Sequence, residues 1–131
     1  MKTIFSALIL ILLLNSCTKF FATPNLILPE LNNTWNLQEV SGGFSGGGRP
    51  ISPNEAITFK ARGTYKGSLK DFPSSGIFTV SGNADSENPP FHYTVTFSRN
   101  TLFYYVAISQ DTLNLISSGN DGYNYLFIRN K

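Results

Sequence analysis

The residues of this chain that could do chemistry are few, and the most conspicuous are glycines. The segment 41–50 reads SGGFSGGGRP, and from Gly43 it comes within two residues of the phosphate-binding pattern G-x-x-x-x-G-K-[ST]. A phosphate cradle needs a helix after the loop, so that backbone amides and the helix dipole point at the anion. Here a β-like segment follows, Arg49 replaces the lysine, and Pro50 replaces the hydroxyl that would hold magnesium. We therefore expect no nucleotide site.

Other reactive groups are equally scarce. His92 is the only histidine and shares a strand face with Thr94 and Thr96, which predicts a solvated side chain rather than a general base. No second histidine can complete a zinc site, and Cys17 is the only cysteine. We expect no metal, no cofactor and no enzyme activity, although a carboxylate pair for glycoside chemistry stays open. The acidic residues in or beside turns, where carboxylates bond backbone amides, are Asp71, Asp85, Glu87, Asp111 and Asp121.

Residues 1–16 read MKTIFSALILILLLNS and have the features of a secretory signal. One lysine precedes an apolar run from Ile4 to Leu14, which is shorter than the roughly 20 residues that a membrane-spanning helix needs. A charged start, a short apolar core and a small-residue boundary are typical of a signal peptide. A buried core helix is the alternative, but it explains neither Lys2 nor the position of Cys17.

The end of this segment resembles the lipobox of bacterial lipoproteins, which Leu14, Ser16 and Cys17 fit. The resemblance implies that the sulfur of Cys17 is diacylated, with chains such as palmitate, and that the peptide is cut before it. Two or three acyl chains would anchor the protein firmly, since each buried methylene contributes about 0.8 kcal/mol. A free reactive thiol is the alternative.

Residues 17–32 carry two prolines and no clear period, and we interpret them as a lipid-anchored tether. Surface lipoproteins of Bacteroidetes often carry an acidic cluster directly after the cysteine. Here residues 18–21 read TKFF, which favours a periplasm-facing leaflet of the cell envelope. The net charge of +2 gives no electrostatic reason to expect a nucleic-acid partner.

From residue 33 to residue 131 the sequence predicts β-structure throughout. No window of 11 or more residues keeps a helical period, and turn signals separate segments rich in aromatic and β-branched residues. Short links make consecutive strands antiparallel neighbours, and eight such strands can close into a barrel that side chains fill or that holds one small ligand. We predict an all-β, eight-stranded antiparallel up-and-down barrel, with a β-sandwich as the alternative. The expected strands are 34–40, 55–60, 63–69, 75–81, 91–97, 101–109, 111–117 and 123–129.

These segments resemble the lipocalin-like (calycin) barrels, in particular the small lipocalin-like lipoproteins of Bacteroidetes. Asn33 stands where true lipocalins have the glycine of G-x-W, and other lipocalin signature segments are absent. The resemblance therefore implies the barrel and no specific lipocalin role. The matching pieces are Trp35-x-Leu37, Ser41-Gly42-Gly43-Phe44, Ile57-Thr58-Phe59, Gly63-Thr64-Tyr65, Asp111-Thr112-Leu113 and Phe127-x-Arg129.

Strand counting places Trp35 and Arg129 at the same end of such a barrel. A guanidinium can lie over the indole there, and the resemblance implies that this pair closes the barrel base. The alternative is an ordinary core tryptophan and a solvated arginine. The loop 41–54 then lies at the opposite end, either as a flap with Phe44 as an apolar plug or as a flexible connection without function.

Alternation along the strands predicts which side chains line the interior. Tyrosines there would offer an apolar wall with a polar tip, which suits an amphipathic ligand, although such residues also fill the cores of small barrels. With the loop residue Phe44, the ligand-lining candidates are Phe59, Tyr65, Phe78, Tyr93, Val95, Tyr104, Leu113 and Tyr125.

Together these features predict a lipid-anchored, lipocalin-like protein that binds a small hydrophobic or amphipathic ligand. The rival is a protein-binding module, since calycin-like barrels include secreted protease inhibitors. The segment 101–109, TLFYYVAIS, is apolar on both faces and could dock such a partner. A filled core with an apolar outer patch favours the rival, whereas an open cavity with a polar exterior favours ligand binding.

Overall fold

The computed structural model describes residues 28–82 and 92–131. The predictions for the signal peptide, for Cys17 and for most of the tether lie outside these residues. A short 3-10 helix, η1 (Pro29–Leu31), is followed by eight strands. Within the two described stretches, no helix has the length and apolar character needed to cross a bilayer. The strands are β1 (Thr34–Gly42), β2 (Ala56–Lys60), β3 (Thr64–Gly67), β4 (Ser75–Gly82), β5 (Tyr93–Phe97), β6 (Phe103–Ser109), β7 (Thr112–Ser117) and β8 (Tyr123–Arg129).

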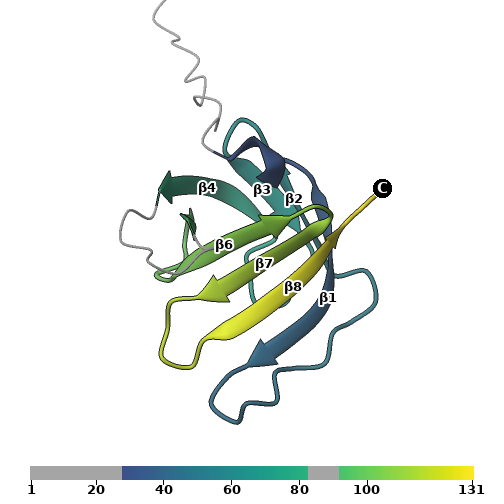
Figure 1. Ribbon diagram of the computed structural model, residues 1–131, viewed down its shortest axis with the longest axis vertical. Helices are drawn as coiled ribbons and strands as arrows, with labels where there is room; N and C mark the ends of the chain where they lie inside the picture. Colours follow the sequence, from purple (N-terminus) through teal and green to yellow (C-terminus); the bar gives the residue numbers. More distant parts are fainter. Residues whose placement is uncertain (1–27, 83–91) are drawn as a thin grey trace, which may run out of the picture.

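Each strand pairs antiparallel with the next, and β8 pairs with β1, which closes the sheet (Figure 1). The prediction of an all-β, eight-stranded up-and-down barrel is confirmed, and the sandwich alternative is wrong. The β1–β8 register runs from Trp35↔Arg129 to Gly42↔Tyr123. In contrast, β1 pairs with β2 only over Thr34–Asn36, so the second half of β1 extends past β2 along β8.

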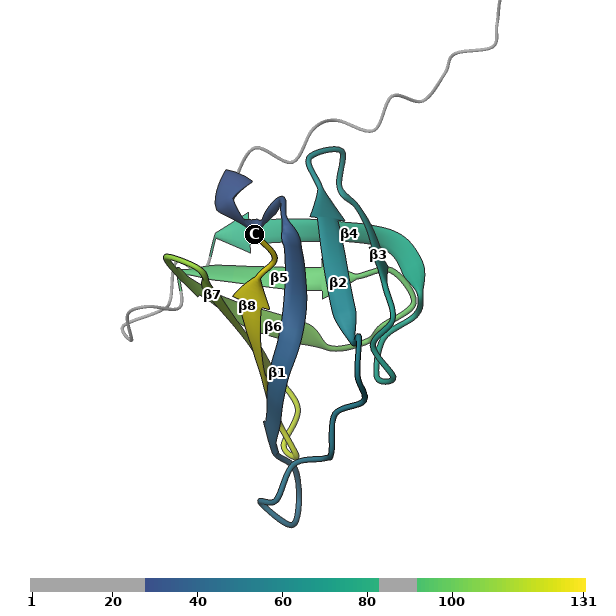
Figure 2. The ribbon, with the colours of Figure 1, turned by 90° about the vertical axis from the view of Figure 1, so that its right-hand side faces the viewer.

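The barrel has two distinct ends (Figure 2). At the end that we call the base lie η1, the start of β1, the β2–β3 turn and the end of β8. At the other end, which we call the mouth, β1 ends and the chain continues through the segment 43–55 to β2. The β3–β4 loop (68–74), the β5–β6 turn and the β7–β8 loop also lie at the mouth, because the strands alternate in direction.

The interior is occupied by a continuous cluster of buried apolar side chains. The period of two is clearest in β7, where Leu113 and Leu115 are fully buried while their neighbours are half-exposed. Aromatic rings meet across the barrel: the ring centroid of Phe59 lies 4.9 Å from that of Phe78 and 5.9 Å from that of Phe97. Such ring pairs contribute about 0.5–1.5 kcal/mol beyond the area they bury.

The base is closed by Trp35, which is fully buried. Its indole Nε1 donates a hydrogen bond to the carbonyl oxygen of Leu31 in η1, at 3.0 Å. On the neighbouring strand, the guanidinium carbon of Arg129 lies 5.2 Å from the centroid of the Trp35 ring, the arrangement that strand counting expects. The guanidinium also donates to the Gln110 carbonyl oxygen, at 3.2 Å, so η1 and the β6–β7 turn both join the base.

Replacing Trp35 by phenylalanine tests this closure. Trp35→Phe removes the bond to Leu31 and leaves part of the indole volume empty, so we expect the unfolding free energy to fall by about 1–3 kcal/mol. Urea unfolding followed by far-ultraviolet circular dichroism measures the change. Lys131→Met, at an exposed position beyond the end of the neighbouring strand β8, is the control and should leave the midpoint unchanged. A Trp35→Phe protein as stable as the wild type would contradict this account of the base.

Candidate functional site

The glycine-rich segment folds back on β1 and carries Arg49 to the mouth. The amide of Gly48 donates to the Gly42 carbonyl oxygen at 2.8 Å, and that of Arg49 donates to the Val40 carbonyl oxygen at 3.3 Å. Gly48 has a φ of 65°, and a Cβ there would collide with the Val40 carbonyl. The glycines thus allow a close backbone approach, which is a different use from cradling a phosphate.

Phe44 does not enter the barrel. Its side chain is 95% exposed, at the tip of the folded-back segment. The prediction that Phe44 plugs the mouth or lines the interior is therefore wrong for this structure. Alternation assigns faces only within strands, and Phe44 lies two residues beyond the end of β1.

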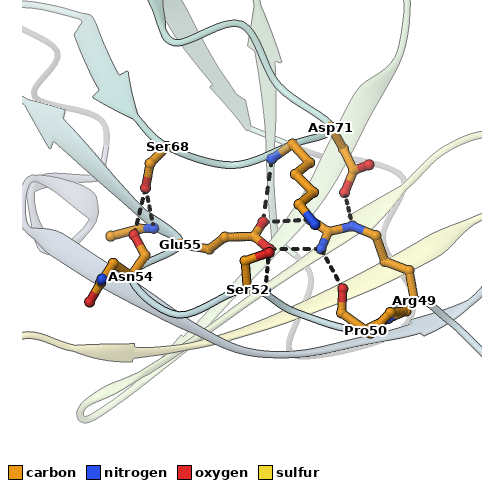
Figure 3. A network of polar contacts seen from close by, with 9 residues as sticks. Arg49, Pro50, Ser52, Asn54, Glu55, Ser68 and Asp71 are labelled. Carbon is orange, nitrogen blue, oxygen red and sulfur yellow. Dashed lines mark hydrogen bonds and ion pairs between the residues drawn. The ribbon is translucent and has the colours of Figure 1, made fainter.

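Arg49 and Glu55 form a bidentate ion pair at the mouth (Figure 3). Nη1 donates to Oε1 at 2.9 Å, and Nη2 donates to Oε2 at 2.7 Å. The Glu55 side chain is only 3% exposed, and its carboxylate also accepts hydrogen bonds from the amides of Ser52, at 2.7 Å, and Lys70, at 3.3 Å. Because a buried charge is tolerated only when paired and hydrogen-bonded, the Arg49 position follows from that of Glu55.

The same guanidinium reaches the β3–β4 loop. Arg49 Nε donates to Asp71 Oδ2 at 2.6 Å, and the Asp71 side chain is 33% exposed. We call Arg49, Glu55 and Asp71 the mouth network. It fixes the β3–β4 loop to the segment 43–55 through two carboxylates on one cation. The hydrogen bonds from Arg49 lower the pKa of Glu55 from 4.5 to about 2, although burial acts in the opposite direction.

Next to Asp71 in the chain, Phe72 inserts into the barrel. Its side chain is 93% buried, and its ring centroid lies 5.1 Å from that of Phe97 and 5.2 Å from those of Tyr104 and Tyr125. We call these three residues the ring cluster. The aromatic plug expected at the mouth therefore exists, but Phe72 supplies it rather than Phe44. Sequence reasoning missed Phe72 because it lies inside the turn signal DFPSS.

Three tyrosine hydroxyls are buried close to this plug. Tyr104 accepts a hydrogen bond from Nδ2 of Asn100 at 2.9 Å. Burial raises the pKa of Tyr125, and the negative charge of the nearby Asp71 carboxylate raises that pKa further. The hydroxyl of Tyr65 is buried and has no hydrogen-bond partner in the part of the chain that the structure describes. Its pKa is raised by burial.

Most of the predicted lining residues do point inward. Tyr93 is half-buried at the edge of the core, and His92 is exposed, as its strand face predicted. Among residues 28–82 and 92–131, no cluster of three or more potential metal-ligating side chains occurs. The lining candidates found in the buried core are Phe59, Tyr65, Phe78, Val95, Tyr104, Leu113 and Tyr125.

The outer face of β6 is also aromatic. Phe103 is 40% exposed and packs edge-to-face on Tyr105, with ring centroids 5.3 Å apart. Tyr105 lies opposite Ile116 of β7, which extends the apolar surface onto the next strand. The segment 101–109 is thus apolar on both faces, as its sequence indicated.

Comparisons of the chain with protein families, with curated proteins and with solved structures find no match in any of the three. The class of protein therefore rests on the architecture. A closed, eight-stranded antiparallel barrel with a buried aromatic core is consistent with a calycin-like fold.

The two carboxylates of the mouth network should differ in their contributions to stability. Glu55→Gln removes a buried charge that accepts four hydrogen bonds, so we expect a loss of about 2 kcal/mol or more in unfolding free energy. Asp71→Asn removes a partly exposed ion pair and should cost less than about 1 kcal/mol. Urea unfolding of the two isosteric variants makes the comparison. Equal losses would contradict the assignment of Glu55 as the buried anchor.

The low pKa of Glu55 also predicts a pH dependence. A carboxyl whose pKa is lower in the folded state stabilises the fold above its unfolded pKa, and this contribution is lost as the pH falls through the folded pKa. We therefore expect the Glu55 contribution to be complete above pH 4.5 and to decline toward pH 2. The difference in urea midpoint between wild type and Glu55→Gln, measured across this range, should narrow as the pH falls. A difference that stays constant would contradict the prediction.

Proposed function

We propose that this protein is a lipid-anchored, lipocalin-like binding protein that takes a small hydrophobic or amphipathic molecule at the barrel mouth. The observation that carries the proposal is Phe72. This ring fills the space within the ring cluster, yet a loop delivers it rather than a strand. A strand residue cannot leave the interior without breaking the sheet, whereas a loop residue can move out while the barrel stays closed.

The chemistry around Phe72 suits an amphipathic ligand. The walls are aromatic, and Tyr65, Tyr104 and Tyr125 add hydroxyls to an otherwise apolar interior. Above them, the mouth network places a guanidinium and two carboxylates at the rim. A site with apolar walls and a few polar groups is what small-molecule sites usually offer. We propose a binding role and not a catalytic one.

The anchor completes the proposed function. The lipobox-like end of the signal supports acylation of Cys17 and a place in the cell envelope, on a periplasm-facing leaflet. Leu28 and η1 join the barrel at its base, so the mouth lies at the end opposite to this junction. A ligand would then reach the mouth from the side away from the membrane.

A second candidate function is protein binding. It is favoured by the interior, which the protein's own side chains occupy, and by the apolar outer face of β6 around Phe103. A partner that docks on this face would need no opening of the mouth. The two functions therefore predict opposite results for a test of the interior.

Native mass spectrometry of the protein purified from its host envelope makes this test. We expect a discrete added mass on the wild type. Tyr104→Trp enlarges a residue of the ring cluster and should abolish it, whereas Phe103→Trp, the matched change on the outer face of the same strand, should keep it. Denatured spectra would show residues 17–131 carrying two or three acyl chains.

The opposite result is equally clear. A wild-type protein without added mass, which also takes up no fatty acid, haem or isoprenoid on incubation, would rule out the ligand hypothesis and leave the protein-binding role.

A further inference from the structure

Two adjacent residues that close the mouth, Asp71 and Phe72, together present a carboxylate and an aromatic ring. Asp71 presents a carboxylate to Arg49 at 2.6 Å, and the next residue, Phe72, places a phenyl ring within the ring cluster. The two adjacent side chains thus place a phenyl group inside the barrel and a carboxylate on the Arg49 guanidinium. Tyr125 lies beside both parts, since its ring packs on Phe72 and the Asp71 carboxylate is near enough to raise the pKa of its hydroxyl.

We propose that Asp71 and Phe72 occupy the site of an aromatic carboxylate, which binds by displacing them. This inference rests on the proposed ligand-binding function and names its ligand class. The ligand ring would take the place of Phe72 within the ring cluster, and its carboxylate would take the place of Asp71 on Arg49. A phenyl ring attached to a carboxylate by a short alkyl chain combines these two groups in one molecule.

Arg49 and Glu55 stay paired when Asp71 leaves the mouth network. Arg49 uses Nη1 and Nη2 for Glu55 and only Nε for Asp71. The bidentate pair with the buried Glu55 therefore holds the guanidinium in place, while its Nε–H becomes available to a new acceptor. The partly exposed Arg49–Asp71 ion pair is weaker than the Arg49–Glu55 pair, because exposed ion pairs contribute little to stability.

Charge selects the ligand class. An incoming carboxylate restores the ion pair that Asp71 gives up, so Arg49 keeps two anionic partners. A neutral aromatic molecule would leave the Nε–H without its charged acceptor, and an amine would meet the guanidinium with like charge. We therefore expect aromatic carboxylates to bind more tightly than the matching alcohols or amines.

Beside the ring cluster lies a buried hydroxyl, that of Tyr65, which has no hydrogen-bond partner among the described residues while Phe72 occupies the cluster. The Phe97 ring contacts Phe72 on one hand and Tyr65 on the other, with its centroid 5.0 Å from that of Tyr65. The Tyr65 side chain is 98% buried, and its hydroxyl has no partner within the described residues. Buried polar groups are normally hydrogen-bonded. The Tyr65 hydroxyl is therefore a hydrogen-bonding group close to the site that Phe72 leaves without a partner.

Calorimetric titration of the full-length protein tests the inference, with 3-phenylpropionate as the probe. Phe72→Ala removes the internal competitor, so it should bind the probe about tenfold or more tightly than the wild type. Phe44→Ala truncates an aromatic residue outside the barrel and is the matched control, with the wild-type affinity expected. If Phe72→Ala does not fold, Phe72→Val, which keeps more apolar volume, serves the same comparison.

The ligand series separates this inference from the proposed function. On Phe72→Ala, 3-phenylpropanol, 3-phenylpropylamine and hexanoate should each bind about tenfold or more weakly than 3-phenylpropionate. Arg49→Lys keeps the charge but loses the bidentate geometry, and it should reduce this preference.

Two outcomes would overturn the inference. If the alcohol binds Phe72→Ala as well as the carboxylate does, the ligand class is wrong, but a mouth that takes apolar molecules stands. If Phe72→Ala binds none of the probes and the native spectra show no added mass, the inference and the proposed function both fail.

Discussion

Strands β1 and β8 share the longest pairing in the barrel, from the Trp35–Arg129 pair at the base to the Gly42–Tyr123 pair at the mouth. This pairing closes the sheet, and closure fixes the width of the interior. Eight strands leave a space that side chains just fill, so each inward ring must fit against rings from the opposite wall. Because β1 follows β8 and leaves β2 early, the mouth between β1 and β2 has to be closed by loops.

The loops close the mouth with adjacent residues of different character, one apolar and buried, the other charged and at the rim. Phe72 fills the interior, while Asp71 beside it stays at the rim and joins the mouth network. Glu55 supplies the buried charge that holds Arg49, and Gly48 lets the segment approach β1 closely enough to bring Arg49 there. The position of the Phe72 ring at the mouth therefore depends on the ion pairs of Arg49 with Asp71 and Glu55.

The sequence predicts the strands of this barrel well, because alternation such as that of Leu113 and Leu115 depends only on neighbours along the chain. Counting strands also places Trp35 and Arg129 together. It does not find the mouth network, because Arg49 and Asp71 are 22 residues apart in loops, where no period applies. Phe72 lies among turn residues that give no signal of burial, and Phe44 is predicted at the mouth because it is the aromatic residue of the glycine-rich loop that strand counting places there.

The start of β1 and the end of β8 lie at the same end of the barrel, and this has a mechanical consequence. The residues before β1 and after β8 emerge side by side at the base, from neighbouring antiparallel strands. Tension between these ends would open the β1–β8 hydrogen bonds one after another, as a zipper opens, so little force would part them. Tension between the N-terminal side and the mouth would instead load many of these bonds at once, in shear. A barrel held at its N-terminal side and pulled at its mouth would therefore resist force in its strong direction.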